Sequence, residues 1–173
     1  MNTFASGKFK RCFLLVLILL VSFASRAGDV ALTVTGEVKT PLKLTLAELQ
    51  TMPAAKASVK DHDGSTGSYE GIPLHAILHN AGVPQGESLR GDPLQLCVLV
   101  SAADGYKACF TLAELDPLFT DRQVLLAYRR NGSDLDAKTG PLRLVIPDEK
   151  RQGRWVRQVT QLEIVRVAGE HKP

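Results

Sequence analysis

LQLCVLVSAADGYKACF, residues 94–110, is the stretch that most directly predicts the fold. Leu94 to Val100 is apolar at nearly every position, which is typical of a strand that is covered on both faces. Ala103-Asp104-Gly105 then has the composition of a turn, and Tyr106 to Phe110 returns along the first strand. The stretch therefore predicts a buried hairpin of two antiparallel strands.

Cys97 and Cys109 lie on these two strands, and the register of the turn decides whether they meet. A turn centred on Ala103 makes them direct cross-strand neighbours. A turn centred on Asp104 makes them diagonal neighbours on one face, and a two-residue turn separates them to opposite faces. A disulfide, which an oxidising compartment would favour, and two apolar buried thiols are both open interpretations.

Outside the hairpin, the same kinds of pattern predict short strands interspersed with short helices. Thr45 and Glu48 form a capping box that opens a helix ended by Pro53, and Pro73 begins a second helix with an apolar stripe. The box recurs at Thr111-Leu-Ala-Glu-Leu115. Further strands are expected at residues 30–35, 54–60, 123–128, 142–146 and 162–167, with a turn at 131–132. The fold class is α+β, with mostly mixed or antiparallel strands.

Residues 1–27 have the features of a secretory signal peptide. Lys8, Lys10 and Arg11 precede an apolar run, and Ser25-Arg26-Ala27 supplies small residues for cleavage before Gly28. The apolar run is too short for a membrane-spanning helix. We expect a single exported domain over residues 28–173, located in the periplasm if the host has two membranes.

The charge pattern argues against a nucleic-acid partner. The whole chain has 21 basic and 18 acidic residues, but four of the basic residues and no acidic residue lie in the signal peptide, so the mature net charge is −1. The remaining charge is polarised, since residues 122–166 carry 10 basic and 5 acidic side chains. This basic C-terminal third is a candidate anion-binding region.

The polar segment Asp61 to Gly71, DHDGSTGSYEG, resembles a calcium loop only superficially. With Gly64 at the turn position of an EF-hand, the first ligand position falls on Val59, so we predict a surface turn instead. His75 and His79 are four residues apart on the second helix, but no further ligand pattern accompanies them. We therefore expect solvated histidines and no metal site.

GPLRLVIPDEKRQGRWVRQV, residues 140–159, carries the most chemistry. Arg143 interrupts an apolar strand, and Arg154 and Arg157 flank Trp155, the only tryptophan of the chain. Guanidinium groups beside a large indole suit a flat, anionic heteroaromatic ligand. The alternative is a core tryptophan whose neighbouring arginines form salt bridges with Asp134, Asp136, Asp148 or Glu149.

Seven segments in order resemble the molybdopterin-binding domain of the sulfite-oxidase-like oxidoreductases. They are TVTGEV, TLAELQTMP, YEGIPLHAILHNAGV, SAADGY, LLAYRRNG, GPLRLVIPD and RWVRQVTQLEIV, and they cover nearly the whole mature chain. The resemblance implies the α+β sulfite-oxidase fold and a pterin or molybdopterin-like ligand held by basic and polar residues.

The family's enzymes carry a molybdenum-ligating cysteine, often as Cys-x-x-Gly, where this chain has Asp61-His62-Asp63-Gly64. Loss of the thiolate should abolish or radically change oxo transfer, so we expect no molybdenum and no catalytic residue. The chain is similar to small exported proteins of this fold that bind free pterins and signal to a membrane-bound cyclic-di-GMP enzyme.

This resemblance predicts a non-catalytic pterin-binding protein whose partner is the periplasmic domain of a membrane-bound signalling protein. Trp155 would stack on the pterin or form a wall of its pocket, and Asp104 or Asp148 would pair with its amino edge. The arginines named above would bind its charge, and Tyr106, Asp63 and Tyr69 would lie nearby. The alternatives are a molybdenum-cofactor oxidoreductase, or a subunit of one, and a structural protein that reuses the fold.

Overall fold

A computed structural model describes residues 28–61 and 63–167 of the chain. The predicted signal peptide lies outside these residues, so it stays a prediction. Among the described residues, no helix is long and apolar enough to cross a membrane.

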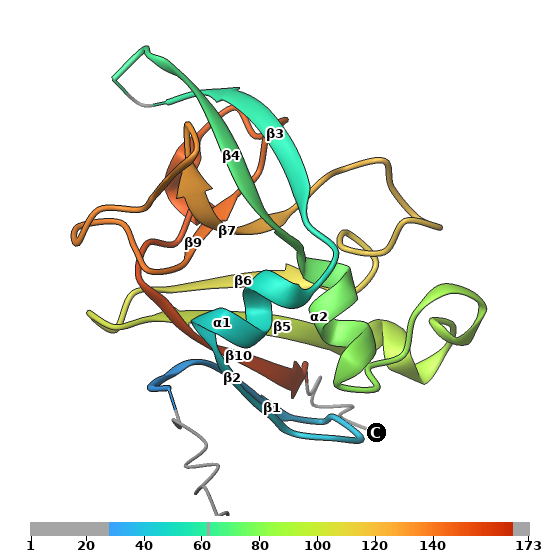
Figure 1. The fold of residues 1–173 in the computed structure, drawn as a ribbon. Helices are drawn as coiled ribbons and strands as arrows, with labels where there is room; N and C mark the ends of the chain where they lie inside the picture. The colour runs from blue at the N-terminus through green and yellow to red at the C-terminus, as the bar shows by residue number, and fades with distance from the viewer. Residues whose placement is uncertain (1–27, 62, 168–173) are drawn as a thin grey trace, which may run out of the picture.

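Two five-stranded sheets form the two layers of the fold, and Figure 1 shows one above the other. The strands of the lower sheet are, in spatial order, β2 (Leu42–Thr45), β1 (Val30–Gly36), β10 (Val159–Arg166), β5 (Leu96–Ala102) and β6 (Lys107–Thr111). The strands of the upper sheet are β3 (Ala55–Lys60), β4 (Thr66–Pro73), β7 (Leu125–Arg130), β8 (Ser133–Asp134) and β9 (Arg143–Val145). The pairing is antiparallel except between β1 and β10, so the predicted mixed α+β class is confirmed.

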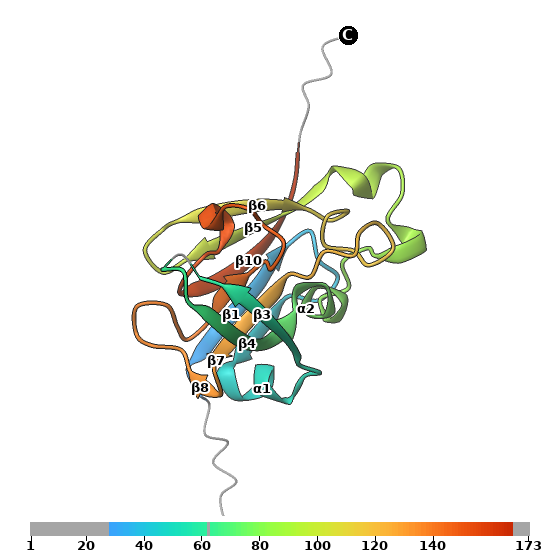
Figure 2. The same cartoon turned by 90° about the horizontal axis from the view of Figure 1, so that it is seen from above.

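The hydrophobic core lies between the two sheets. Seen from above, β3 and β4 cross over β1 and β10 (Figure 2). Alternate residues of the strands, such as Leu32 and Val34 of β1 and Ala57 and Val59 of β3, are buried in this core. The helices α1 (Leu46–Thr51) and α2 (Leu74–Asn80) lie on the near side in Figure 1 and add Leu49 and the predicted apolar stripe. The described residues thus share one core.

The hairpin that opened the sequence analysis is present. Strand β5 is buried along nearly its whole length. It begins at Leu96 and not at the predicted Leu94, because Leu94 is exposed in a short 3-10 turn that precedes the strand. Leu99 pairs with Cys109 and Cys97 with Thr111, so the turn is centred on Asp104. Cys97 and Cys109 are therefore diagonal neighbours on one face, and both are free thiols. Of the two interpretations left open by the sequence, free thiols and a disulfide, this structure has the free thiols.

The two TLAEL segments behave differently. At Thr45 the capping box begins α1, as predicted, with the Glu48 side chain accepting the backbone N–H of Thr45. The box at Thr111 also forms, but turns follow it and no helix does. Pro117 restricts the residue before it, and the Asp116 carboxylate accepts the backbone N–H groups of Gly86 and Leu118, which holds a turn.

Candidate functional site

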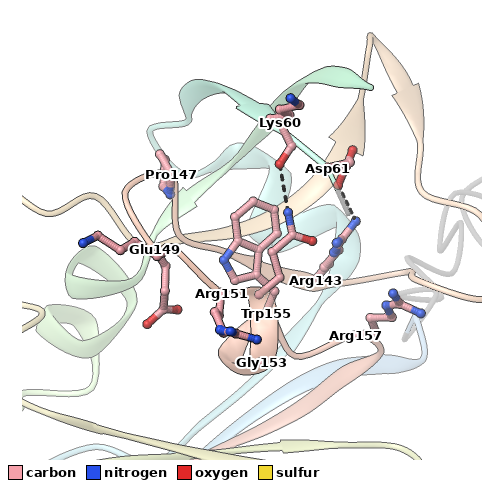
Figure 3. Close-up of a pocket in the computed structure, with 11 residues that line it drawn as sticks. Lys60, Asp61, Arg143, Pro147, Glu149, Arg151, Gly153, Trp155 and Arg157 are labelled. Atoms are coloured by element: carbon pink, nitrogen blue, oxygen red, sulfur yellow. Dashed lines mark hydrogen bonds and ion pairs between the residues drawn. The ribbon is translucent and has the colours of Figure 1, made fainter. Parts of the chain in front are cut away.

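The fold contains an open groove with a volume of about 930 Å³. It lies between Lys60 and Asp61, at the end of β3, and the segment between β9 and β10 that carries Trp155 (Figure 3). Its lining residues are Lys60, Asp61, Arg143, Pro147, Glu149, Lys150, Arg151, Gln152, Gly153, Trp155 and Arg157. Two smaller cavities of about 280 and 240 Å³ adjoin it, since each shares lining residues with it, including Arg157.

The wall of the groove is built on the segment after β9. A 3-10 turn at Gln152–Arg154 ends with the Trp155 N–H donating to the Gln152 carbonyl. Gln152 also donates its side-chain amide to the Lys60 carbonyl at 2.8 Å, which ties this segment to the end of β3. The backbone N–H of Leu144 donates to the Val156 carbonyl. These hydrogen bonds attach the backbone on both sides of Trp155 to β3 and β9.

Trp155 forms a wall of the pocket and does not offer a free face. Its side chain is only 5% exposed, and the Arg143 guanidinium carbon lies 5.4 Å from the ring centroid. Its indole N–H is buried without a partner among the described residues. A buried donor of this kind normally has an acceptor, so a ligand or water that reaches it would be favoured. Of the two roles expected for Trp155, the geometry favours the wall.

An ionic cluster, formed by Asp61, Tyr69, Arg130 and Arg143, lies at the inner end of the groove, where the groove meets the cavity of about 240 Å³. Arg130 is 35% exposed, and the other three side chains are largely buried. Arg143 is only 6% exposed, and its Nη1 donates to the Tyr69 hydroxyl at 2.6 Å and lies 3.5 Å from Asp61 Oδ1. The Tyr69 hydroxyl donates to the Asp61 carboxylate at 2.9 Å. Arg130 Nη2 contacts Asp61 Oδ2 at 2.8 Å. Burial and the hydrogen bond to Asp61 raise the pKa of Tyr69 to about 12, so the phenol stays protonated and donates.

The outer part of the groove carries basic side chains without acidic partners. Lys60, Lys150, Arg151 and Arg157 are exposed and line the groove. None of them lies within 4.0 Å of a carboxylate of residues 28–61 or 63–167. Of the two acids in the lining, Asp61 is held by two arginines and Glu149 by Arg154. The groove is therefore strongly electropositive and suits an anion.

The structure brings most of the predicted site residues to this region. Asp104 and Tyr106 line the second cavity with Trp155, and the Tyr106 hydroxyl donates to the Gly153 carbonyl at 2.5 Å. Asp63 and Tyr69 line the third, where the Asp63 carboxylate accepts from Ser65. Arg157 lines both of these cavities, and Arg143 lines the third.

Two of the predicted residues are placed elsewhere. The Arg154 guanidinium pairs with Glu149 and Glu114 and lies 4.5 Å from the Phe110 ring centroid, so it belongs to a structural salt bridge. Asp148 is exposed and does not line the groove. For Arg154, the alternative of a salt bridge to Glu149 is the arrangement observed.

Several lining residues were not singled out from the sequence. Lys150, Arg151 and Gln152 lie in the segment 140–159, and the excess of basic residues in that segment was the signal that could have identified them. Lys60 and Arg130 come from strands in which alternation gave no hint of function.

No group of three histidine, cysteine, aspartate or glutamate residues that could hold a metal ion occurs within residues 28–61 and 63–167. Asp61 and Glu70, two ligands that an EF-hand would need, are paired with arginine or lysine instead. His75 and His79 lie on α2 and line different small cavities away from the groove. His62 lies outside the described residues.

The groove fits the organic part of a molybdenum cofactor better than the metal. Four basic side chains without acidic partners and an orphaned indole N–H suit an anionic heterocycle. Among the described residues, no sulfur atom lines the groove, and Cys97 and Cys109 lie on β5 and β6. A thiolate-ligated molybdenum does not fit this donor set.

Comparisons with known proteins agree with the fold. The sequence model of the oxidoreductase molybdopterin binding domain matches residues 21–171. Among solved structures, the sulfane dehydrogenase SoxCD from Paracoccus pantotrophus is similar, with a TM-score of 0.62 and 23% identity over 79% of this chain. The match spans only 38% of the SoxCD chain. No curated protein has a matching sequence.

Proposed function

The chain belongs to the family of oxidoreductase molybdopterin-binding domains, and from this premise we propose that it binds a pterin without catalysing oxo transfer. The observation that carries the proposal is the electropositive groove beside Trp155, in which four basic side chains have no acidic partner. A pterin is a flat heterocycle, and anionic substituents on it would pair with these side chains.

Each part of the groove has a role in this proposal. Arg157 lines all three adjoining cavities and is the central cation for the ligand. Asp104, whose carboxylate accepts the Tyr106 N–H at 2.9 Å, lies where the amino edge of a pterin could donate to it. The buried indole N–H of Trp155 would donate to a ring nitrogen or carbonyl of the ligand.

The absence of catalysis in this proposal rests on the donor atoms. The segment Asp61-His62-Asp63-Gly64, where we place the position of the family's cysteine, contains no sulfur. The Asp61 carboxylate already accepts from Tyr69 and pairs with Arg130 and Arg143, so it is not free to bind a metal. We infer a protein that recognises a molecule and does not transform it.

We further propose that the protein is exported to the periplasm and passes the pterin signal to the periplasmic domain of a membrane-bound cyclic-di-GMP enzyme. The predicted signal peptide and the resemblance to small exported pterin-binding proteins support this part. Deleting the gene should change the cellular cyclic-di-GMP level, and an Arg157→Gln variant should fail to restore it. Unchanged levels would reject the signalling role and leave pterin binding to be judged separately.

Native mass spectrometry of the protein purified from its own cells, combined with metal analysis, tests the binding proposal. We expect a bound pterin at up to one per chain and no stoichiometric molybdenum. Stoichiometric molybdenum with a dithiolene would instead support the second candidate, a molybdenum-cofactor oxidoreductase or a subunit of one. That candidate is favoured by the family's oxidoreductases and by the similarity to a dehydrogenase structure.

Affinity measurements with a free pterin and its phosphate ester locate the ligand. Arg157→Gln should weaken binding about tenfold or more, because it removes one hydrogen bond to a charged group. Arg90→Gln is the matched control, since Arg90 is an exposed arginine that lines none of the three cavities. Equal losses in both variants would mean that the pterin does not bind in the groove.

A further inference from the structure

Three donors converge on one carboxylate at the inner end of the groove. Asp61 receives contacts from Arg130 Nη2 at 2.8 Å, from Arg143 Nη1 at 3.5 Å and from the Tyr69 hydroxyl at 2.9 Å. Figure 3 shows Asp61 and Arg143 directed toward each other. The Asp61 side chain is only 9% exposed, so its charge is balanced by protein and not by water.

The cationic groups are held in place by contacts that do not involve Asp61. The Arg143 guanidinium lies between two aromatic rings, 5.3 Å from the centroid of Tyr69 and 5.4 Å from that of Trp155. Arg130 donates to Ser65 Oγ at 2.9 Å and lies 5.8 Å from the Tyr69 ring centroid. The donors would therefore keep their arrangement if the carboxylate were removed.

Gly67 makes room for this arrangement. A Cβ atom at Gly67 would lie 2.7 Å from Arg130 Nε, so the Arg130 side chain would have to shift, and it would make a tight contact of 3.3 Å with Asp61 Oδ2. The backbone thus leaves space for a guanidinium beside a carboxylate at this point. The Nε atoms of Arg130 and Arg143 are buried without partners among the described residues, which leaves donors in excess over the single carboxylate.

We propose that Arg130, Arg143 and Tyr69 form an oxyanion-binding site that Asp61 fills from within the chain. Asp61 is then a specificity-determining residue that closes the inner end of the groove to small oxyanions such as carboxylates. Anionic ligands are left with the outer cations, Lys60, Lys150, Arg151 and Arg157. This inference needs no pterin and stands independently of the proposed function.

Chemical rescue tests the proposal, with formate as the probe. Asp61→Ala leaves a buried guanidinium without its counter-ion and should lower the melting temperature by about 10 °C. Sodium formate should then raise the melting temperature of this variant in a saturable way, by about 4 °C at a tenfold excess over its dissociation constant. Sodium chloride at the same ionic strength serves as the reference.

Glu37→Ala is the matched control variant. This variant also removes a carboxylate from an arginine, but the side chains of Glu37 and Arg166 are 46% and 34% exposed. Formate should therefore change its melting temperature no more than chloride does. The native chain should show the same salt effect and no saturation. Adding Arg143→Met to Asp61→Ala should abolish the formate-specific rise, because the site then lacks its most buried cation.

Equal effects of formate and chloride on Asp61→Ala would overturn the proposal. If this variant does not fold in sodium chloride, the recovery of folded protein after refolding in sodium formate tests the proposal instead. Recovery of folded protein in formate alone supports an oxyanion site, and no recovery in either salt refutes it. Asp61→Asn keeps the space filled, so it should lose stability without gaining a response to formate.

Discussion

A double-mutant cycle on Asp61 and Arg143 measures how strongly the buried pair is coupled. Their side chains are 9% and 7% exposed, and Arg143 Nη1 lies 3.5 Å from Asp61 Oδ1, with the Tyr69 hydroxyl bridging them. Asp61→Ala alone should cost about 3–5 kcal/mol of the free energy of unfolding, because it leaves an uncompensated buried charge. Arg143→Met alone should cost less, because Asp61 keeps Arg130 and Tyr69.

The double variant should be more stable than the sum of the two losses predicts. Removing both charges removes the orphaned guanidinium as well, so we expect a coupling energy of about 1.5–3 kcal/mol. Urea unfolding followed by far-ultraviolet circular dichroism measures the four free energies. Fluorescence of Trp155, the only tryptophan, is a second probe that tests for two-state behaviour.

The surface pair between Glu37 and Arg166 provides the comparison. Its closest atoms are only 2.6 Å apart, but its side chains are 46% and 34% exposed. The same cycle there should give about 0.2–1 kcal/mol. We expect burial to affect the coupling energy of an ion pair more than the distance between its atoms does. The reasoning is refuted if the exposed pair has a coupling energy equal to or above that of the buried pair.

Three further predictions address other parts of the molecule. Burial raises the pKa of Tyr69 from 10.0 to about 12. The stability that the protonated phenol contributes is therefore fully present below pH 10 and is lost as the pH rises from 10 to 12. Tyr69→Phe should flatten this alkaline loss of stability and remove the latest step of the tyrosinate absorbance titration. In the native protein, the exposed Cys109 should react with a thiol reagent roughly tenfold faster than Cys97, because burial raises the pKa of the Cys97 thiol. If neither thiol reacts after denaturation, the protein contains a disulfide between them instead. Thr45→Ala should lower the free energy of unfolding in urea by about 1 kcal/mol, because it removes a helix cap. Thr111→Ala removes a capping box that no helix follows, so its effect should stay within about 0.5 kcal/mol. Equal losses in the two variants would contradict the difference between the two boxes.

Local patterns predicted the elements well. The apolar run predicted at Leu94–Val100, the capping box at Thr45 and the turn at Asn131–Gly132 depend on residues a few positions apart. The box and the turn are confirmed, and the run forms a strand that is shifted by two residues to Leu96–Ala102. The box at Thr111 shows where local chemistry stops being sufficient. The same five letters form the same hydrogen bonds there, but the Asp-Pro sequence that follows and the contact of Asp116 with Gly86 hold a turn.

The candidate site was predicted in composition more than in arrangement. The sequence identified Arg143, Trp155 and Arg157 as a group, and the structure places them around one groove. It gave no reason to prefer Arg157 over Arg154 as a free cation. Arg154 is held by Glu149, five residues away, and by Glu114, which is forty residues away and comes within 2.6 Å of it only in the folded chain.

The amino-acid sequence by itself determined most of the strand and helix pattern, the net charge of residues 28–173 and the lack of sulfur at residues 61–64, because these follow from residue identity and short-range periodicity. Tertiary structure alone decided which charges are satisfied. Arg143 reaches Tyr69 across 74 positions and Gln152 reaches Lys60 across 92. Such pairings arise when segments far apart in the sequence come together in and around the upper sheet, since the partner of a buried polar group is set by position in space and not by separation along the chain.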